Sequence, residues 1–202
     1  MATGEAPSKV GAGLLICCEG ACLVLKRSEA SGNPGSWGLP GGNADPEDAG
    51  DLLKTALREA GEEIGALPEG LQVRGSILTR RGKALQKRYT IFICTIPPPS
   101  RAAYQPTLND EHTDWRWLDV NHAWALARPH AVAHEPGAHD KPLMGASAQE
   151  EAAAAAAAAA GPPPSDMALH PVVRILFGGA NVAELQSMLP PPGAGGSTGG
   201  AA

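Results

Sequence analysis

The first part of the chain alternates apolar runs with short turns, a pattern typical of β-hairpins. Residues 14–18 and 21–25 are almost wholly apolar, and a Glu-Gly turn dipeptide separates them. Residues 72–81 and 87–96 are further strand-like runs with β-branched and aromatic side chains, joined by a short glycine-containing turn. We expect these runs to form strands of one buried sheet.

A helical spacing of apolar residues lies between the two hairpins. Leucines and alanines recur on one side of a helix from residue 52 to residue 60. Asp48 or Asp51 can cap the start of this helix, and Gly65 and Pro68 end it.

The region after the second hairpin contains a loop, a strand and a short helix. The prolines at 97–99 end the preceding strand, and we expect a loop over 100–114. A short strand follows at 115–118, and Asp119 caps a helix over 120–127.

The composition changes beyond residue 128, where proline, alanine, glycine and histidine dominate and nine alanines run from 152 to 160. An apolar pattern returns over 167–189, which we expect to dock on the sheet as a terminal helix, with a tethered partner-binding helix as the alternative. The chain is therefore divided into a disordered lead (1–10), a folded domain (11–129), a low-complexity insertion or linker (130–165), a C-terminal helical segment (166–190) and a disordered tail (191–202).

Charge separates the chain's possible ligands. The formal net charge of −5 does not favour nonspecific binding to nucleic acid, so no duplex nucleic-acid partner is expected. Residues 71–109 nevertheless contain no acidic residue and seven basic ones, so this region attracts anions or is a basic, solvated hairpin. The basic residues are Arg74, Arg80, Arg81, Lys83, Lys87, Arg88 and Arg101.

The four cysteines lie in apolar stretches without metal-binding spacing, which favours reduced core residues of an intracellular protein. Apolar runs are too short to span a membrane, and the first residues lack the apolar region of a secretory signal. A cytoplasmic location is expected, with organellar targeting left open.

The chemistry concentrates in the predicted helix at 52–64. Glu59, Glu62 and Glu63 fall on one helical face beside Arg58, where like charges one turn apart repel. A solvated acidic face is the alternative. A glycine-rich loop immediately upstream, at 40–42, lets backbone approach a ligand and favours a metal–phosphate site.

These residues resemble the signature of the Nudix hydrolases, from Gly41 to Ala66. The family pattern is Gly, five residues, Glu, seven residues, Arg-Glu, an aliphatic, any residue, Glu-Glu, any residue, Gly and an aliphatic, and the chain matches its second half from 58 to 65. In the first half Gly42 lies sixteen residues before Arg58 instead of fourteen. We therefore expect a two-residue insertion within 45–50, with Glu47 in place of the early glutamate.

The resemblance implies an α+β fold, an α/β/α sandwich with a mixed sheet between helices, in the domain at 11–129. It also implies Mg²⁺, or alternatively Mn²⁺, as the cofactor and hydrolysis of a nucleoside diphosphate linked to another group. Nucleoside triphosphates, dinucleoside polyphosphates and nucleotide sugars remain open as substrates. The alternative is a weak or inactive member that serves as a nucleotide-binding or assembly subunit.

The resemblance also suggests roles for individual residues. Glu59, Glu62, Glu63 and the carbonyl of Gly41 are the candidate metal ligands, and Arg58, Glu59, Glu62 and Glu111 are the candidate catalytic residues, with Asp110 and Asp114 as rivals of Glu111. The candidate substrate-binding residues are Arg27, Arg81, Lys87 and Arg88. The candidate platforms for base stacking are Tyr89, Tyr104 and Trp115, whereas Trp37 is expected to be a core anchor. A small-molecule nucleotide is the expected partner, with no membrane partner and a possible protein partner at 167–189.

Overall fold

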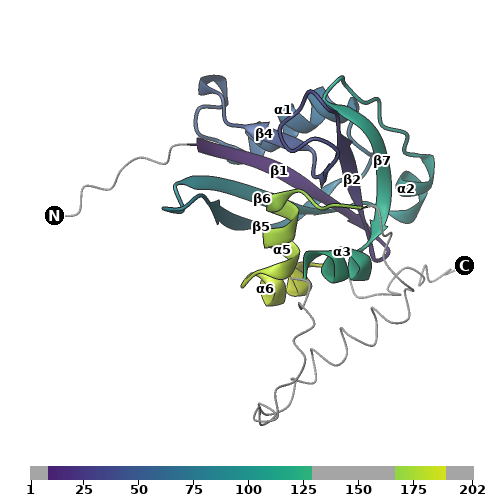
Figure 1. The fold of residues 1–202 in the computed structure, drawn as a ribbon. Coiled ribbons are helices and arrows are strands. Elements are labelled where there is room, and N and C mark those ends of the chain that lie inside the picture. Colours follow the sequence, from purple (N-terminus) through teal and green to yellow (C-terminus); the bar gives the residue numbers. More distant parts are fainter. Residues whose placement is uncertain (1–8, 129–166, 190–202) are drawn as a thin grey trace, which may run out of the picture.

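A mixed β-sheet with helices on both faces forms the body of the protein (Figure 1). The structure, a computed structural model, describes residues 9–128 and 167–189. The low-complexity insertion predicted at 130–165 and the tail predicted at 191–202 lie outside the described residues.

Seven strands make up the sheet, in the order β3-β2-β1-β6-β5, with β4 paired to β1 and β7 paired to β2. The β1–β6 pairing is parallel and the other pairings are antiparallel. The strands are β1 (Lys9–Cys18), β2 (Ala21–Arg27), β3 (Trp37–Gly38), β4 (Gly41–Asn43), β5 (Gln72–Arg81), β6 (Lys87–Thr95) and β7 (His112–Asp119).

Strand β1 is longer than the apolar run that predicted it. It begins at Lys9, within the expected lead, because its first half pairs with β6 on one side and β4 on the other. Gly11 and Gly13 carry no apolar side chain, so this half of the strand gave no hydrophobic signal. β1 pairs with β2 only at Cys17 and Cys18, which leaves room for β4.

Helix α1 (Leu52–Ile64) covers one face of the sheet and three short helices cover the other: α3 (Val120–Ala127), α5 (Pro171–Gly178) and α6 (Val182–Met188) (Figure 1). Asp51 caps α1 by accepting from the backbone N–H groups of Leu53 and Lys54. The predicted α+β class, with a mixed sheet between helices, is confirmed.

The C-terminal segment differs from the single helix predicted for it. Gly178 and Gly179 interrupt it, so two helices form, and their apolar side chains pack against the sheet and α3. Phe177 meets Trp124 of α3 edge to face, with ring centroids 5.8 Å apart. In this structure these side chains are buried within the chain rather than presented to a partner.

The loop predicted over 100–114 is partly wrong. Helix α2 (Pro98–Ala103) begins within the prolines, because the first turn of a helix does not need their missing N–H groups. Strand β7 begins at His112, three residues before the predicted strand.

All four cysteines are free and buried, as predicted, and burial raises the pKa of Cys22 and of Cys94 to about 12. Across the two described ranges, no helix is long and apolar enough to cross a membrane.

Candidate functional site

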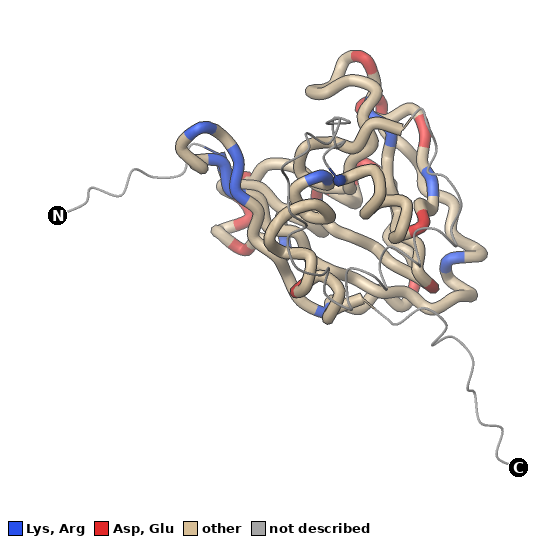
Figure 2. Tube along the Cα trace, turned by 60° about the horizontal axis from the view of Figure 1, so that its bottom comes forward, with Lys and Arg blue, Asp and Glu red and all other residues tan. Residues whose placement is uncertain are grey.

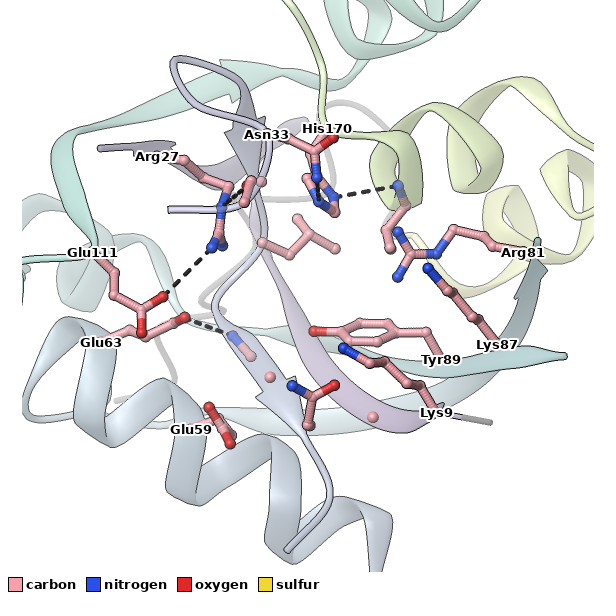
Figure 3. A pocket seen from close by; sticks show the side chains of 18 of the residues that line it. Lys9, Arg27, Asn33, Glu59, Glu63, Arg81, Lys87, Tyr89, Glu111 and His170 are labelled. Carbon is pink, nitrogen blue, oxygen red and sulfur yellow. Dashed lines mark hydrogen bonds and ion pairs between the residues drawn. The ribbon is translucent and has the colours of Figure 1, made fainter. Parts of the chain in front are cut away.

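A cavity of about 720 Å³ opens beside α1, where β1, β4 and β6 lie next to one another (Figure 3). It brings together the candidate carboxylates and the candidate substrate-binding residues, although these come from distant parts of the chain. The predicted site residues that line it are Glu59, Glu62, Glu63, Glu111, Gly41, Arg27, Arg81, Lys87 and Arg88.

The glycines of β4 allow the backbone to lie against α1 and β1. Gly41 has a φ of 142°, and a Cβ there would lie 2.3 Å from the Cα of Gly13. A Cβ on Gly42 would lie 2.1 Å from a carboxylate oxygen of Glu59. Glycine is therefore required at position 41, where backbone atoms are in the way, whereas a side chain at position 42 would displace the Glu59 carboxylate.

Glu63 is the buried carboxylate of the site, with only 5% of its surface exposed. Its Oε2 accepts a hydrogen bond of 2.7 Å from the backbone N–H of Gly41. Burial raises the pKa of Glu63 to about 8, with smaller upward contributions from Glu111 and Glu59, while the Gly41 N–H and Arg27 oppose the rise. The N–H of Gly41 therefore orients Glu63, and the expected role of its carbonyl as a metal ligand stays a prediction.

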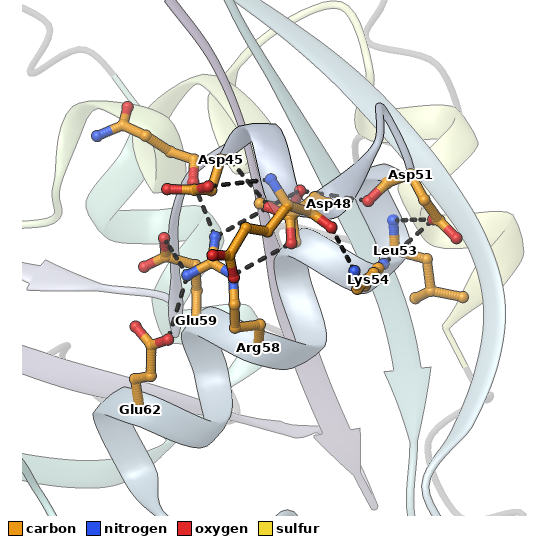
Figure 4. A network of polar contacts seen from close by, with 11 residues as sticks. Asp45, Asp48, Asp51, Leu53, Lys54, Arg58, Glu59 and Glu62 are labelled. Carbon is orange, nitrogen blue, oxygen red and sulfur yellow. Dashed lines mark hydrogen bonds and ion pairs between the residues drawn. The ribbon is translucent and has the colours of Figure 1, made fainter.

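Arg58 holds the other two helix carboxylates together (Figure 4). Its Nη1 lies 3.0 Å from Oε1 of Glu59 and 3.2 Å from Oε1 of Glu62. The side chain of Glu59 is 19% exposed and that of Glu62 is 58% exposed, so the face runs from the buried Glu63 to solvent. Burial raises the pKa of Glu59, with Arg58 opposing.

Asp48 anchors the opposite side of the same guanidinium and is completely buried. Arg58 donates to it twice, from Nε to Oδ1 at 3.1 Å and from Nη2 to Oδ2 at 2.9 Å. The Oγ1 of Thr55 and the backbone N–H of Asp45 also donate to Oδ2. These hydrogen bonds, led by that from Arg58, hold the pKa of Asp48 well below its usual range.

The prediction that Glu47 replaces the early glutamate is therefore wrong. Glu47 is exposed, and its carboxylate makes no hydrogen bond or ion pair with Arg58. Asp48 instead follows Gly42 after five residues, at the spacing where the family pattern has its early glutamate. The two extra residues lie between Asp48 and Arg58, where Ala49 and Gly50 both have positive φ, 51° and 81°. The two extra residues therefore lie in a turn with left-handed backbone, after the carboxylate that binds Arg58.

Glu111 reaches the cavity because its loop is docked on the end of α1. The backbone N–H of Asn109 donates to the carbonyl of Glu63 at 3.2 Å, and the carbonyl of Glu111 accepts from the N–H of Ser28 at 2.8 Å. The Glu111 carboxylate lies 3.4 Å from Nη2 of Arg27. The rivals Asp110 and Asp114 do not line the cavity.

His112, the residue after Glu111, makes this docking sensitive to acid. Its ring is buried, Nδ1 lies 3.3 Å from Oδ1 of Asn109, and Nε2 is buried without a hydrogen-bond partner. Burial, with a smaller contribution from Arg27, lowers the pKa of His112 to about 4. In the unfolded chain His112 takes up a proton near pH 6.5, whereas in the folded protein it does so only near pH 4. The free energy of unfolding therefore falls as the pH drops from 6.5 towards 4.

We expect wild-type protein to lose about 1–2 kcal/mol more unfolding free energy than His112→Gln between pH 7 and pH 5. Urea unfolding of both proteins at each pH measures this difference. Equal losses would show that His112 does not carry the acid sensitivity.

Only one of the three candidate stacking platforms lines the cavity. Tyr89 lies beside Gly11 and Gly13, where an added Cβ would come within 3.0 Å and 2.6 Å of its side chain. The Tyr104 hydroxyl instead donates to the carbonyl of Ala66, and the half-buried Trp115 packs against the core cluster that includes α1. Trp37 is buried in the core, as predicted, with the guanidinium carbon of Arg116 4.7 Å from its ring centroid.

Several cavity residues were not predicted from the sequence, among them Lys9, Asn33 and His170. Nε2 of His170 lies 3.2 Å from Nδ2 of Asn33, which ties the start of α5 to the loop before β3. Burial, then Arg81 and Arg27, lowers the pKa of His170 to about 4. The N-cap pattern His-Pro could have predicted the helix start, but no local signal places His170 beside residues more than a hundred positions earlier.

The carboxylates do not form a ready-made metal site: within 9–128 and 167–189, no three His, Cys, Asp or Glu side chains are arranged to hold an ion. Their chemistry nevertheless fits a hard divalent cation, because all donors are oxygens. Glu59 and Glu111 each raise the pKa of Glu63, so the three side chains repel one another as anions. Only Oε1 of Glu59 is paired with Arg58, so Oε2 would face a cation shared with Glu63 while the ion pair stays, whereas Glu111 would turn from Arg27.

Comparison with known proteins identifies the family of the domain. The profile of the NUDIX domain matches residues 7–140. A curated relative, "Putative 8-oxo-dGTP diphosphatase 3" of Mycobacterium tuberculosis, is 30% identical over 101 residues, which are 50% of this chain and 45% of the relative. The match thus spans less than half the length of that relative.

Two solved structures are among those similar to this chain. An Ap4A hydrolase from C. elegans is 24% identical, with a TM-score of 0.47, over 58% of this chain and 84% of the other. The Nudix hydrolase RenU from M. smegmatis is 25% identical, with a TM-score of 0.47, over 56% of this chain and 72% of the other. Because the NUDIX domain profile matches about two thirds of the sequence, the chain belongs to the Nudix family.

Proposed function

We propose that the protein hydrolyses the diphosphate linkage of a nucleoside diphosphate joined to another group, with Mg²⁺ as cofactor and Mn²⁺ as a substitute. The observation that carries this proposal is a single cavity lined by four carboxylates, from α1 and the loop before β7, and by five Lys and Arg side chains. A multiply charged anion would be repelled by the carboxylates alone, which is why a cation must mediate its binding.

The residues divide the work by burial and charge. Glu59 and Glu63, the less exposed pair, would hold the metal together with Glu62 or Glu111, and Arg58 fixes the position of Glu59 through the buried Asp48. Glu62 and Glu111, whose side chains are 58% and 55% exposed, remain solvated and suited to accept a proton from the attacking water. Arg27 would bind a phosphate oxygen once Glu111 releases it. The metal supplies charge neutralisation and a more acidic bound water.

A substrate screen tests the proposal. We expect purified protein to hydrolyse at least one of three substrate classes, nucleoside triphosphates including oxidised ones, dinucleoside polyphosphates or nucleotide sugars, with Mg²⁺ or Mn²⁺. Excess EDTA should lower the rate by roughly 100-fold or more, because the carboxylates then repel the substrate. Separate assays for released phosphate and pyrophosphate identify the bond that breaks.

The alternative, a nucleotide-binding or assembly subunit without turnover, predicts metal-dependent nucleotide binding and no hydrolysis in the same screen. The displaced early glutamate and the long low-complexity insertion both favour this alternative. Because Asp48 binds Arg58 at the spacing of the early glutamate, the first of these two features no longer supports it.

A further inference from the structure

Three basic side chains form a row across adjacent strands at one end of the cavity. Lys9 of β1 lies opposite Lys87 of β6, and Lys87 lies opposite Arg81 of β5. All three line the cavity. Figure 2 shows basic residues gathered at the free end of the β5–β6 hairpin, beside the start of β1. We call Lys9, Lys87 and Arg81 the cationic row.

The cationic row lacks compensating charge. No carboxylate in the described part of the chain lies within ion-pair distance of its members. The Nε of Arg81 is buried and makes no hydrogen bond, and burial lowers the pKa of this guanidinium. Like charges opposite one another on neighbouring strands destabilise a sheet, and a buried N–H without an acceptor adds a further cost. Both costs disappear if an anion binds there.

The cationic row lies apart from the carboxylates. In Figure 3, Glu59 and Glu63 lie on one side of the cavity and Arg81, Lys87 and Lys9 on the other, with Tyr89 between them. The pKa of Tyr89, raised chiefly by burial, is raised further by Glu63 and Glu59 and lowered by Arg81, so its hydroxyl is within electrostatic range of both ends. A phosphate group at the carboxylate end would leave the row unneutralised.

We propose that the cationic row is an anion subsite for a substrate phosphate beyond the diphosphate linkage that is cleaved. The inference rests on the proposed hydrolase function and narrows its substrate class. The preferred substrates are then phosphoric anhydrides with at least one additional phosphate, such as dinucleoside polyphosphates. Nucleotide sugars, whose only phosphates are those of the cleaved linkage, would leave the row empty.

Two substrates that share adenosine but differ in phosphate number test this proposal with Mg²⁺ present. We expect kcat/KM to be higher for diadenosine tetraphosphate than for ADP-ribose. In Arg81→Gln and in Lys87→Gln, the loss of kcat/KM should be roughly tenfold or more greater for diadenosine tetraphosphate, because a charge-assisted phosphate contact is lost. Arg80→Gln and Lys83→Gln are matched controls, since both are exposed residues of the same hairpin that do not line the cavity.

Binding of inorganic tripolyphosphate in EDTA, measured by calorimetry, separates the subsite from turnover. Wild-type protein and Arg80→Gln should bind, and Arg81→Gln should bind at least about tenfold more weakly. If wild-type protein hydrolyses none of the substrates in the screen but binds tripolyphosphate through Arg81, the proposed function fails and the anion subsite stands. Equal losses on both substrates, or tripolyphosphate binding unaffected by Arg81→Gln, would overturn the inference.

Discussion

Glu63→Gln should lower kcat for diphosphate hydrolysis on the order of 1,000-fold while leaving the fold intact. Glutamine keeps the volume and one oxygen that can accept from the Gly41 N–H, but it removes the negative charge at the most buried point of the site. Steady-state kinetics with Mg²⁺ on whichever substrate the screen identifies measure the loss. Glu69→Gln, at an exposed position outside the cavity, is the control.

The same substitution should raise stability when metal is absent. The pKa of Glu63 is about 8 in the folded protein and near 4.5 in the unfolded chain, so the stabilisation is complete below pH 4.5 and is lost as the pH rises through 8. Glutamine cannot ionise and avoids this loss. At pH 8 in EDTA we expect Glu63→Gln to have a higher Tm than wild-type protein. Adding Mg²⁺ should raise the Tm of wild-type protein more than that of Glu63→Gln. Wild-type activity in the variant would refute the role of Glu63.

Asp48→Asn should lower activity by about 10- to 100-fold and lower Tm, although Asp48 does not line the cavity. An amide cannot match a carboxylate that accepts four hydrogen bonds, two of them from Arg58. Without its anchor the guanidinium is free to reorient, and the hold on Glu59 and Glu62 weakens. Activity assays and thermal unfolding at pH 7 measure both effects.

Glu47→Gln is the matched control, because it removes a charge one residue away without touching the Arg58 network. The depressed pKa of Asp48 also fixes the pH dependence: its stabilisation is present above pH 3.8 and is lost as the pH falls through the folded pKa. The Tm difference between wild-type protein and Asp48→Asn should therefore shrink at low pH. A larger loss in Glu47→Gln than in Asp48→Asn would restore Glu47 as the functional residue.

Local pattern predicted the parts of the fold that depend on neighbouring residues. The spacing of Glu59 and Glu63 on a helix, the turn between β1 and β2 and the Asp119 cap of α3 all follow from periodicity or capping. The loop at 45–50 could not be predicted in this way, because the sequence allows a two-residue insertion on either side of the carboxylate that binds Arg58. The structure shows that the insertion follows Asp48, where Ala49 has a left-handed backbone.

Contacts between distant segments of the chain could not be predicted from the sequence. Lys9 lies in the row with Arg81 because β1 and β6 pair in parallel from the first residue of each. Nothing near Lys9 encodes that register. The apolar pattern of the terminal segment likewise predicted which of its residues are buried. It did not predict that His170 lies at the cavity, because that position depends on backbone pairing with Trp37.

The pairing of Trp37 with the segment before α5 also sets an order of events during synthesis. The backbone N–H of Trp37 donates to the carbonyl of Ala168, and the N–H of His170 donates back to the carbonyl of Trp37, both at 2.8 Å. A ribosome has made the carboxylates, the glycine loop and the cationic row well before it reaches these residues. The nascent chain can therefore assemble the charged half of the cavity early, whereas the wall that contains His170 closes only when the last described segment emerges.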